Sequence, residues 1–342
     1  MATEEKKKGF PFELRGYEYV KPLGQGSEGT VALAINTATR QQVAVKYSQD
    51  RNGIGYEVIA LETLGYHPNI IHMRDYGIEG TYAYVILDYH WGDYYTWLQG
   101  TFCDKPGSLK KKWAEEEKHP ILLNKEEIIK RFALHLARAL DHMQSLGWIH
   151  RDVKPENSGI AFPNSPDDPQ FLLCDFGGAR KITDNDGMLI KAELRTFDVM
   201  TTPAYASPRT IMAYPQYYVD DAGALVFSVG YCAFLLPSLE MFTSPIPKTM
   251  ATEKFAFLQN PVVYLARKKA MILMKVLPAW YLHFIILVSE ELRRSTEQPF
   301  PYQGAISLIK VTEDTSADRK RKLGPENNAE QFSSAYPLAR NR

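Results

Sequence analysis

The run His150-Arg-Asp-Val-Lys-Pro-Glu-Asn157 is followed, after a turn-rich stretch, by Leu173-Cys-Asp-Phe-Gly177. Asp152 offers a carboxylate that can accept a hydroxyl proton, and Lys154 adds a positive charge two residues further on. Transfer of a phosphoryl group from a nucleotide needs such a carboxylate, together with cations that neutralise the phosphate oxygens. The alternative is two unrelated polar surface loops, but two runs of this composition rarely follow one another by chance. The two runs therefore predict one phosphotransfer site.

The same two runs carry oxygen ligands for a divalent cation. Asn157 closes the first run and Asp175 lies inside the second. Amide and carboxylate oxygens are hard ligands of the kind that Mg²⁺ prefers. We therefore expect Asn157 and Asp175 to hold Mg²⁺.

A glycine-rich string lies between two β-branched and aromatic runs, 17–23 and 30–36. A dinucleotide fingerprint of similar spacing opens a helix, whereas this string links two expected strands. A glycine-rich hairpin lets backbone N–H groups approach phosphates without a clash with Cβ atoms. The string therefore predicts a phosphate-binding hairpin. Its residues are Leu23, Gly24, Gln25, Gly26, Ser27, Glu28, Gly29, Thr30 and Val31.

Lys46 closes the apolar run Val43-Ala-Val-Lys46. A lysine inside an apolar strand is costly unless its ammonium group has an anionic partner. The helical segment expected near 54–66 offers two carboxylates, Glu57 and Glu62. We expect Lys46 to pair with one of these two residues and with a phosphate group.

Strand-like runs prevail up to Asp93, and helix-like runs prevail after it. The run 126–146 has apolar residues spaced by three and four, and Gly147 follows it, which is typical of a long amphipathic helix. The other expected elements are short strands at 17–23, 30–36, 41–48, 82–89, 158–162 and 171–174. This order predicts an α+β protein with a small sheet-based lobe followed by a larger helical lobe.

Composition narrows the choice of function. The 342 residues carry 40 basic and 40 acidic side chains, so the formal net charge is zero. Neutrality removes the simplest argument for a nucleic-acid-binding or membrane-surface protein. Cys103, Cys174 and Cys232 form no CxxC pair, which argues against a disulfide framework or a zinc site and suits a reducing compartment. We expect neither direct nucleic-acid binding nor membrane association.

One uncharged stretch, Ala222–Leu239, is at the short limit for a membrane span, and Pro237 interrupts it. A helix that is apolar on all sides can also be the central buried helix of a large domain, which is the interpretation we favour.

Both ends and one internal stretch fall outside the pattern of strands and helices. Residues 1–16 form an N-terminal extension, and about 101–127 form a charged insertion. Residues 312–342 are polar and lack periodicity, so we expect a disordered tail. The basic cluster Arg319-Lys-Arg-Lys322 in that tail is a weak nuclear address, and we expect the protein in the cytoplasm, the nucleus or both.

Taken together, the motifs and their order resemble the eukaryotic protein kinase family over about residues 17–311. The resemblance implies a bilobal kinase domain, with an N-lobe over 17–88 and a C-lobe over 94–311. It implies an enzyme that uses ATP with Mg²⁺ or Mn²⁺ to phosphorylate serine and threonine hydroxyls of proteins, because Lys154 is the family's residue of the Ser/Thr type. We expect the protein to be a monomer.

The resemblance also implies a role for each motif residue. Asp152 would be the catalytic base, and Asn157 and Asp175 would hold Mg²⁺. Lys46 would contact the α- and β-phosphates, with Glu57 or Glu62 as its partner. Lys154 would assist Asp152. Outside the glycine-rich hairpin, the implied nucleotide site consists of Ala44, Lys46, the gatekeeper Leu87, the hinge residues Asp88, Tyr89 and His90, and also Asp93 and Asp175.

Two later residues match family positions that support the catalytic loop. Thr202 would be the threonine of the activation segment that contacts Asp152 and Lys154. Asp221 would anchor the catalytic loop from the buried central helix.

A closer resemblance is to the casein kinase 1 group, including its vaccinia-related and tau-tubulin relatives. Asn36–Lys46 looks like that group's hairpin, and Gly77–Tyr82 looks like its turn before the hinge strand. Tyr205-Ala-Ser207 stands where other kinases lead into Ala-Pro-Glu. The group's spacing selects Glu57 over Glu62 as the partner of Lys46.

The sequence also departs from the family. Gly159 stands where a leucine usually lies under the adenine ring, and Gly223 stands where a large side chain is common. Ser207-Pro-Arg209 replaces Ala-Pro-Glu, so the usual Glu–Arg brace of the helical lobe is missing. Gly159, Gly223 and the charged insertion leave open a catalytically weak or inactive kinase-fold scaffold that binds partners. A small-molecule phosphotransferase, which shares the fold, is a further alternative.

Overall fold

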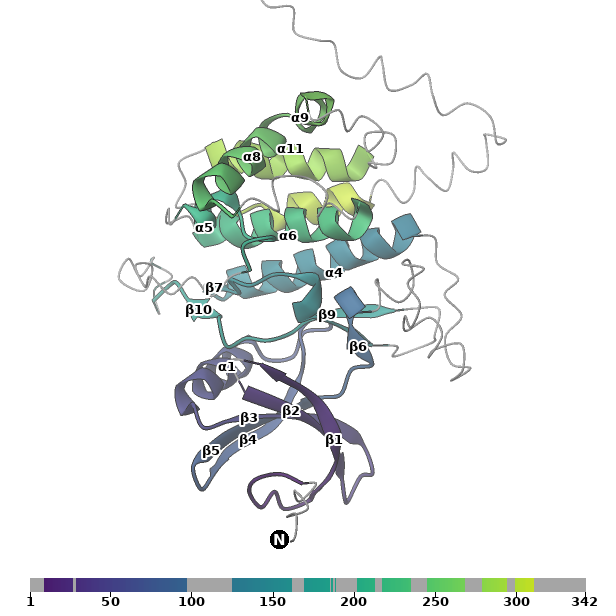
Figure 1. Ribbon diagram of the computed structural model, residues 1–342, viewed down its shortest axis with the longest axis vertical. Helices are drawn as coiled ribbons and strands as arrows, with labels where there is room; N and C mark the ends of the chain where they lie inside the picture. Colours follow the sequence, from purple (N-terminus) through teal and green to yellow (C-terminus); the bar gives the residue numbers. More distant parts are fainter. Residues whose placement is uncertain are drawn as a thin grey trace, which may run out of the picture.

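The computed structural model describes residues 9–26, 29–96, 125–161, 169–184, 186, 188, 202–212, 217–234, 245–267, 279–293 and 299–310. Ser27 and Glu28, most of the charged insertion and the polar tail lie outside these residues, so the expectations for them stay predictions. Within the described part, a small sheet-based lobe is followed by a larger helical lobe, as the sequence predicts (Figure 1).

The small lobe is built on a five-stranded antiparallel sheet with the order β1-β2-β3-β5-β4. Its strands are β1 (Tyr17–Gly26), β2 (Gly29–Asn36), β3 (Gln42–Ser48), β4 (Met73–Glu79) and β5 (Tyr82–Asp88). The sequence pattern missed β4 because its residues are all partly or fully exposed and show no apolar face. It is an edge strand, and polar edge strands are a common protection against unwanted pairing.

Helix α1 (Arg51–Leu64) packs against this sheet, as Figure 1 shows. The carboxylate of Asp50 accepts hydrogen bonds from the N–H groups of Asn52 and Gly53, which caps the first turn. Gly65 ends the helix with φ 62°, a conformation that glycine adopts at no steric cost. The buried face of α1 consists of Ile54, Val58, Ala60, Leu61 and Leu64, together with Glu57.

The larger lobe is a stack of helices above the sheet in the view of Figure 1. It contains α4 (Lys125–Ser145), α5 (Pro208–Ile211), α6 (Tyr217–Phe234), α8 (Pro247–Gln259), α9 (Pro261–Arg267), α11 (Ala279–Arg293) and a last helix over 302–310. Helix α6 contacts α4 on one side and α11 on the other, and its described side chains from 221 to 230 are buried. The uncharged stretch after Asp221 is therefore a central helix for as far as it is described. No helix in the described ranges combines the length and apolar character needed to cross a membrane.

Short elements between the lobes bring the two polar runs together. Strands β6 (Gly92–Asp93), β8 (Ser158–Ala161) and β9 (Gln170–Leu173) form one small sheet, and β7 (Trp148–Ile149) pairs with β10 (Arg180–Lys181). A 3₁₀ turn, η1 (Pro155–Asn157), leads into β8. The Cys174 N–H donates to the Asn157 carbonyl over 2.9 Å, so the run that ends at Asn157 lies beside the run that contains Asp175.

Candidate active site

Lys46 lies in the interior between the sheet and α1. Its ammonium nitrogen is 2.8 Å from a carboxylate oxygen of Glu57 and 2.7 Å from one of Asp175. Lys46 and Glu57 are buried, whereas Glu62 is exposed on the outer face of α1. The choice of Glu57 as the partner of Lys46 is therefore confirmed. Two carboxylates beside a buried ammonium group compensate for its removal from water.

Glu57 also reaches the second polar run directly. Its other carboxylate oxygen accepts a hydrogen bond from the Phe176 N–H over 3.2 Å. The preceding residue, Asp175, has φ 65°, which costs a non-glycine residue roughly 1–2 kcal/mol. Helix α1 therefore holds the backbone next to Asp175 in an unusual conformation through one carboxylate.

Asp152 is surrounded by hydrogen-bond donors that fix its carboxylate. One oxygen is 2.6 Å from the Lys154 ammonium and 3.0 Å from the Asn157 amide nitrogen. The other oxygen accepts from the N–H and the hydroxyl of Thr202, over 2.9 and 3.2 Å. Lys154 also donates to the Thr202 hydroxyl over 2.8 Å. The expected contacts of Thr202 with Asp152 and Lys154 are thus confirmed, and the carboxylate is oriented from both sides.

Asp221 of α6 holds the start of this loop. Its two oxygens accept from the N–H groups of His150 and Arg151, over 2.6 and 2.8 Å. Arg151 has φ 76°, so these bonds stabilise a strained backbone. Burial raises the pKa of the Asp221 carboxyl, while His150 and Arg151 act in the opposite direction. The prediction that Asp221 anchors the loop is confirmed.

The residues expected to hold Mg²⁺ fit a hard cation. The amide nitrogen of Asn157 donates to the carbonyl and the carboxylate of Asp152, which leaves its amide oxygen without a partner among the described residues. Asp175 contributes a carboxylate from the adjacent backbone. In the described part of the chain, no three His, Cys, Asp or Glu side chains gather as a metal site. The arrangement therefore suits an ion that takes its remaining ligands from phosphate and water.

The glycine-rich hairpin is the turn between β1 and β2. Gly24 pairs with Val31, Gln25 with Thr30 and Gly26 with Gly29. Gly29 has φ 142°, and a Cβ there would lie 2.6 Å from the Tyr47 carbonyl oxygen, so only glycine fits. The expected link between two strands is thus confirmed, and the close approach of Gly29 to β3 is a feature that the sequence did not predict.

The expected base site lies between β3, β5 and the small sheet. Ala44 pairs with Leu87 in the sheet, and both are buried. Asp88, Tyr89, His90 and Asp93 follow as the partly buried connection between the lobes. Sequence reasoning missed one feature of this connection, namely that the His90 ring packs directly on Gly159. A Cβ at position 159 would lie 2.8 Å from Cγ of that ring.

His90 is held in this place by the backbone of Gly92. Its Nδ1 lies 3.1 Å from the Gly92 carbonyl oxygen, so this nitrogen carries the proton and donates. Burial lowers the pKa of His90, which favours the neutral ring. A neutral aromatic ring therefore occupies the space that a leucine at position 159 would fill.

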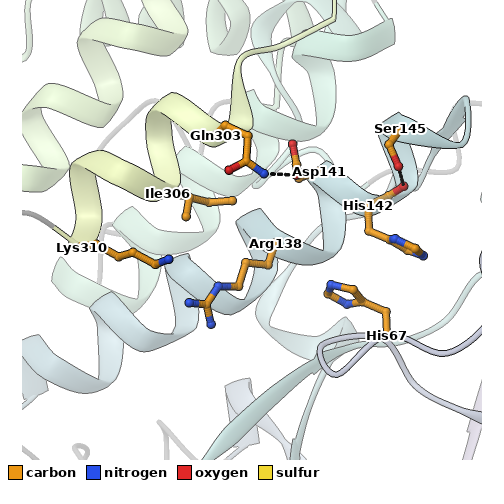
Figure 2. A pocket seen from close by; sticks show the side chains of 8 residues that line it. All are labelled: His67, Arg138, Asp141, His142, Ser145, Gln303, Ile306 and Lys310. Atoms are coloured by element: carbon orange, nitrogen blue, oxygen red, sulfur yellow. Dashed lines mark hydrogen bonds between the residues drawn. The ribbon is translucent and has the colours of Figure 1, made fainter.

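A second cavity, of about 360 Å³, lies away from this site, between the loop after α1, the end of α4 and the last helix (Figure 2). In it, the rings of His67 and His142 stack 4.8 Å apart at 18°. The Leu64 carbonyl accepts a hydrogen bond from Nε2 of His142 over 2.8 Å. One residue that lines the cavity, His142, is therefore bonded to the end of the helix that carries Glu57.

Comparison with known proteins finds one matching family and several relatives. The family described as "Protein kinase domain" matches residues 17–273. Relatives include "Ribosomal protein S6 kinase alpha-2" of Mus musculus, 28% identical over 224 residues, which are 65% of this chain and 26% of that protein. "Ribosomal protein S6 kinase alpha-3" of Homo sapiens is 28% identical over 223 residues, again 65% and 26% of the two chains. "Ribosomal protein S6 kinase 2 alpha" of Gallus gallus is 27% identical over 223 residues, 65% and 25% of the two chains. The match spans about a quarter of the length of these relatives.

Proposed function

Because this chain belongs to the protein kinase domain family, we propose that it transfers the γ-phosphate of ATP to serine and threonine hydroxyls of proteins. The observation that carries the proposal is the set of contacts around Asp152, made by Lys154, Asn157 and Thr202. A carboxylate held from both sides is ready to accept a proton from one defined direction.

In the proposed reaction, the substrate hydroxyl oxygen bonds to the γ-phosphorus while the bond from that phosphorus to the β,γ-bridging oxygen breaks. The hydroxyl proton passes to Asp152, and ADP leaves. The ammonium of Lys154, 2.6 Å from Asp152, lies where it can offset negative charge on the transferred group. Mg²⁺ held by Asn157 and Asp175 would neutralise phosphate oxygens.

Lys46 orients the nucleotide in this proposal. Its two carboxylate partners fix the ammonium group, and Lys46 pairs in the sheet with Val31, the last residue of the glycine-rich string. Ala44 and Leu87 would supply apolar contact for the base, and the His90 ring packs on Gly159 where a leucine would otherwise lie. The glycine at position 159 therefore does not argue for an inactive scaffold, because His90 fills the space.

The specificity for serine and threonine rests on Lys154, on its bond to Thr202, and on the names of the relatives, which are ribosomal S6 kinases. The casein kinase 1-like subtype rests on the sequence resemblance alone, because the relatives reported above carry a different name. The cytoplasmic and nuclear location and the monomeric state are proposed on the sequence alone.

The test is transfer of radioactive phosphate from ATP to a Ser-rich acidic protein with Mg²⁺ or Mn²⁺. Asp152→Asn should abolish transfer, and Asp186→Asn, at an exposed acidic residue, should not. Equal rates for wild type and Asp152→Asn would refute the proposal. A rise in Tm with Mg-ATP that Lys46→Met removes would separate a nucleotide-binding enzyme from an inert scaffold.

A further inference from the structure

Lys254 of α8 is fully buried in the helical lobe, with 0% of its surface exposed. Its ammonium nitrogen lies 2.9 Å from the carbonyl oxygens of Pro203 and Ala204 and 2.6 Å from that of Ala206. The same nitrogen lies 4.3 Å above the ring of Phe227 in α6. The burial of Lys254 could not be predicted from the sequence, because a lysine at a helical position normally points to solvent.

The contacts of Lys254 match an ammonium group. An ammonium has three N–H donors, and three carbonyl oxygens lie within hydrogen-bond distance of it. A neutral amine would direct its lone pair at one of these oxygens. Burial lowers the pKa of Lys254 well below its ordinary value. The three acceptors and the ring face of Phe227 act in the opposite direction, because both favour the charged form.

The three carbonyls belong to an irregular segment that lacks the hydrogen bonds of a strand or a long helix. Tyr205 and Ala206 in this segment are buried. Buried backbone carbonyls need donors, and an unsatisfied group costs about 1–3 kcal/mol. The long side chain of Lys254 therefore supplies, through the core, the anchor that this segment needs.

The anchored segment begins at Thr202. The N–H groups of Tyr205 and Ala206 both donate to the Thr202 carbonyl over 3.0 Å, which closes one tight turn. The other side of Thr202 meets Asp152 through its N–H over 2.9 Å and through its hydroxyl. The turn is thus held by Lys254 at its carbonyls and by Asp152 at its first residue.

We propose that Lys254 is a positioning residue for phosphotransfer, which acts by holding the turn 202–206 so that Thr202 orients Asp152 and Lys154. The inference rests on the proposed kinase activity. Lys254 lies in the helical lobe and makes no contact with Lys46 or Glu57 in the described part of the chain, so its action is on the transfer step and not on nucleotide affinity.

The first measurement is steady-state kinetics on Lys254→Met, which keeps an unbranched side chain of nearly the same length and removes its donors. We expect kcat to fall about 10- to 100-fold, because a misplacement of about 1 Å at a reacting centre costs up to 100-fold. The Kd for Mg-ATP should stay within twofold of the wild-type value. Lys248→Met on the exposed side of the same helix is the matched control and should leave both quantities unchanged.

A double-mutant cycle with Thr202→Ala decides whether Lys254 acts through Thr202. If it does, Lys254→Met lowers kcat much less in the Thr202→Ala background than in the wild type. Independent losses that multiply would overturn the proposal, and so would an unchanged kcat in an active protein. If Lys254→Met does not fold, as judged by its thermal transition, Lys254→Gln is put through the same cycle because it keeps two N–H donors. A wild-type protein without transfer activity would refute the proposed function instead.

Discussion

The His90 ring lies so close to Gly159 that a single added methyl group would be 2.8 Å from its Cγ atom and 2.9 Å from its Cδ2 atom. The Sγ atom of Cys174 lies 3.1 Å from the same point. Such distances leave no room for a side chain at position 159. The absence of a side chain at position 159 therefore makes room for the His90 ring in the proposed base site.

We predict that Gly159→Leu weakens nucleotide binding. The leucine would displace the His90 ring, and overpacking of this kind costs about 1–3 kcal/mol, or about 5- to 150-fold in Kd. His90→Ala alone should weaken binding about tenfold, because it leaves a void under the base. The double variant His90→Ala/Gly159→Leu restores the volume and should bind Mg-ATP more tightly than either single variant. Titration calorimetry gives all three values.

His283→Ala is the control for this cycle, because His283 is exposed on α11. If the effects of His90→Ala and Gly159→Leu on the Kd for Mg-ATP are strictly additive, the two side chains do not compete for the same space. That result would contradict the prediction.

A second prediction concerns the charge on α1. Glu57→Gln keeps the shape of the side chain but removes its negative charge. Lys46 then keeps its ion pair with Asp175 and loses its ion pair with Glu57. Loss of one member of a buried ion pair is strongly destabilising. We expect kcat to fall at least tenfold and Tm to fall by several degrees. Glu62→Gln, on the exposed face of the same helix, should behave like the wild type in both assays. If Glu57→Gln and Glu62→Gln lose activity equally, the activity does not depend on the buried ion pair between Lys46 and Glu57.

The contacts that were predicted from the sequence join residues that lie in recognisable sequence motifs. Lys46 stood out because a lysine closed an apolar strand, and the spacing of related chains then selected Glu57. Thr202 and Asp221 were found through the resemblance to the protein kinase family and not from a local pattern. Only at Lys46 did a charged residue occupy a position that is costly without a partner, so that the partner could be sought.

The two departures at glycines could not be interpreted from the sequence, because each depends on a neighbour that is distant along the chain. Gly159 packs on His90, and a Cβ at Gly223 would lie 2.7 Å from the Cβ atom of Ser207. The sequence suggested lost contacts at both positions and hence a scaffold. In the structure, both glycines allow close packing instead. Strand β4 was missed for a different reason, since its exposed residues carry no apolar periodicity.

A third prediction tests the glycine-rich hairpin. Gly29→Ala places a Cβ 2.6 Å from the Tyr47 carbonyl oxygen at a φ of 142°, so the hairpin must shift. We expect the Kd for Mg-ATP to rise about tenfold or more, since this strain is of the order of 1–3 kcal/mol. Gly24→Ala in the same hairpin meets no atom within 4 Å and should have a small effect. Equal Kd values for the two variants would show that the backbone at Gly29 does not shape the site.

The stacked histidines in the cavity of Figure 2 predict a pH dependence of stability. Burial, His142 and Arg138 lower the pKa of His67 to about 4, from an ordinary value of 6.5. Its Nδ1 accepts the Asn69 N–H over 3.1 Å, which also requires the neutral ring. Between these two pKa values the unfolded chain binds more protons than the folded protein. The contribution of His67 is therefore present above about pH 6.5 and is lost as the pH falls through about 4.

We expect this loss to be about 1–2 kcal/mol, less than the full shift in pKa corresponds to, because the ring is only partly buried and solvent screens it. Urea unfolding at pH 7 and pH 5 measures the effect. The wild type should lose more stability between the two values than His67→Gln, whereas His283→Gln, at an exposed histidine, should lose as much as the wild type. Parallel losses in all three proteins would show that His67 is not the titrating group, whatever the stability of each variant at pH 7.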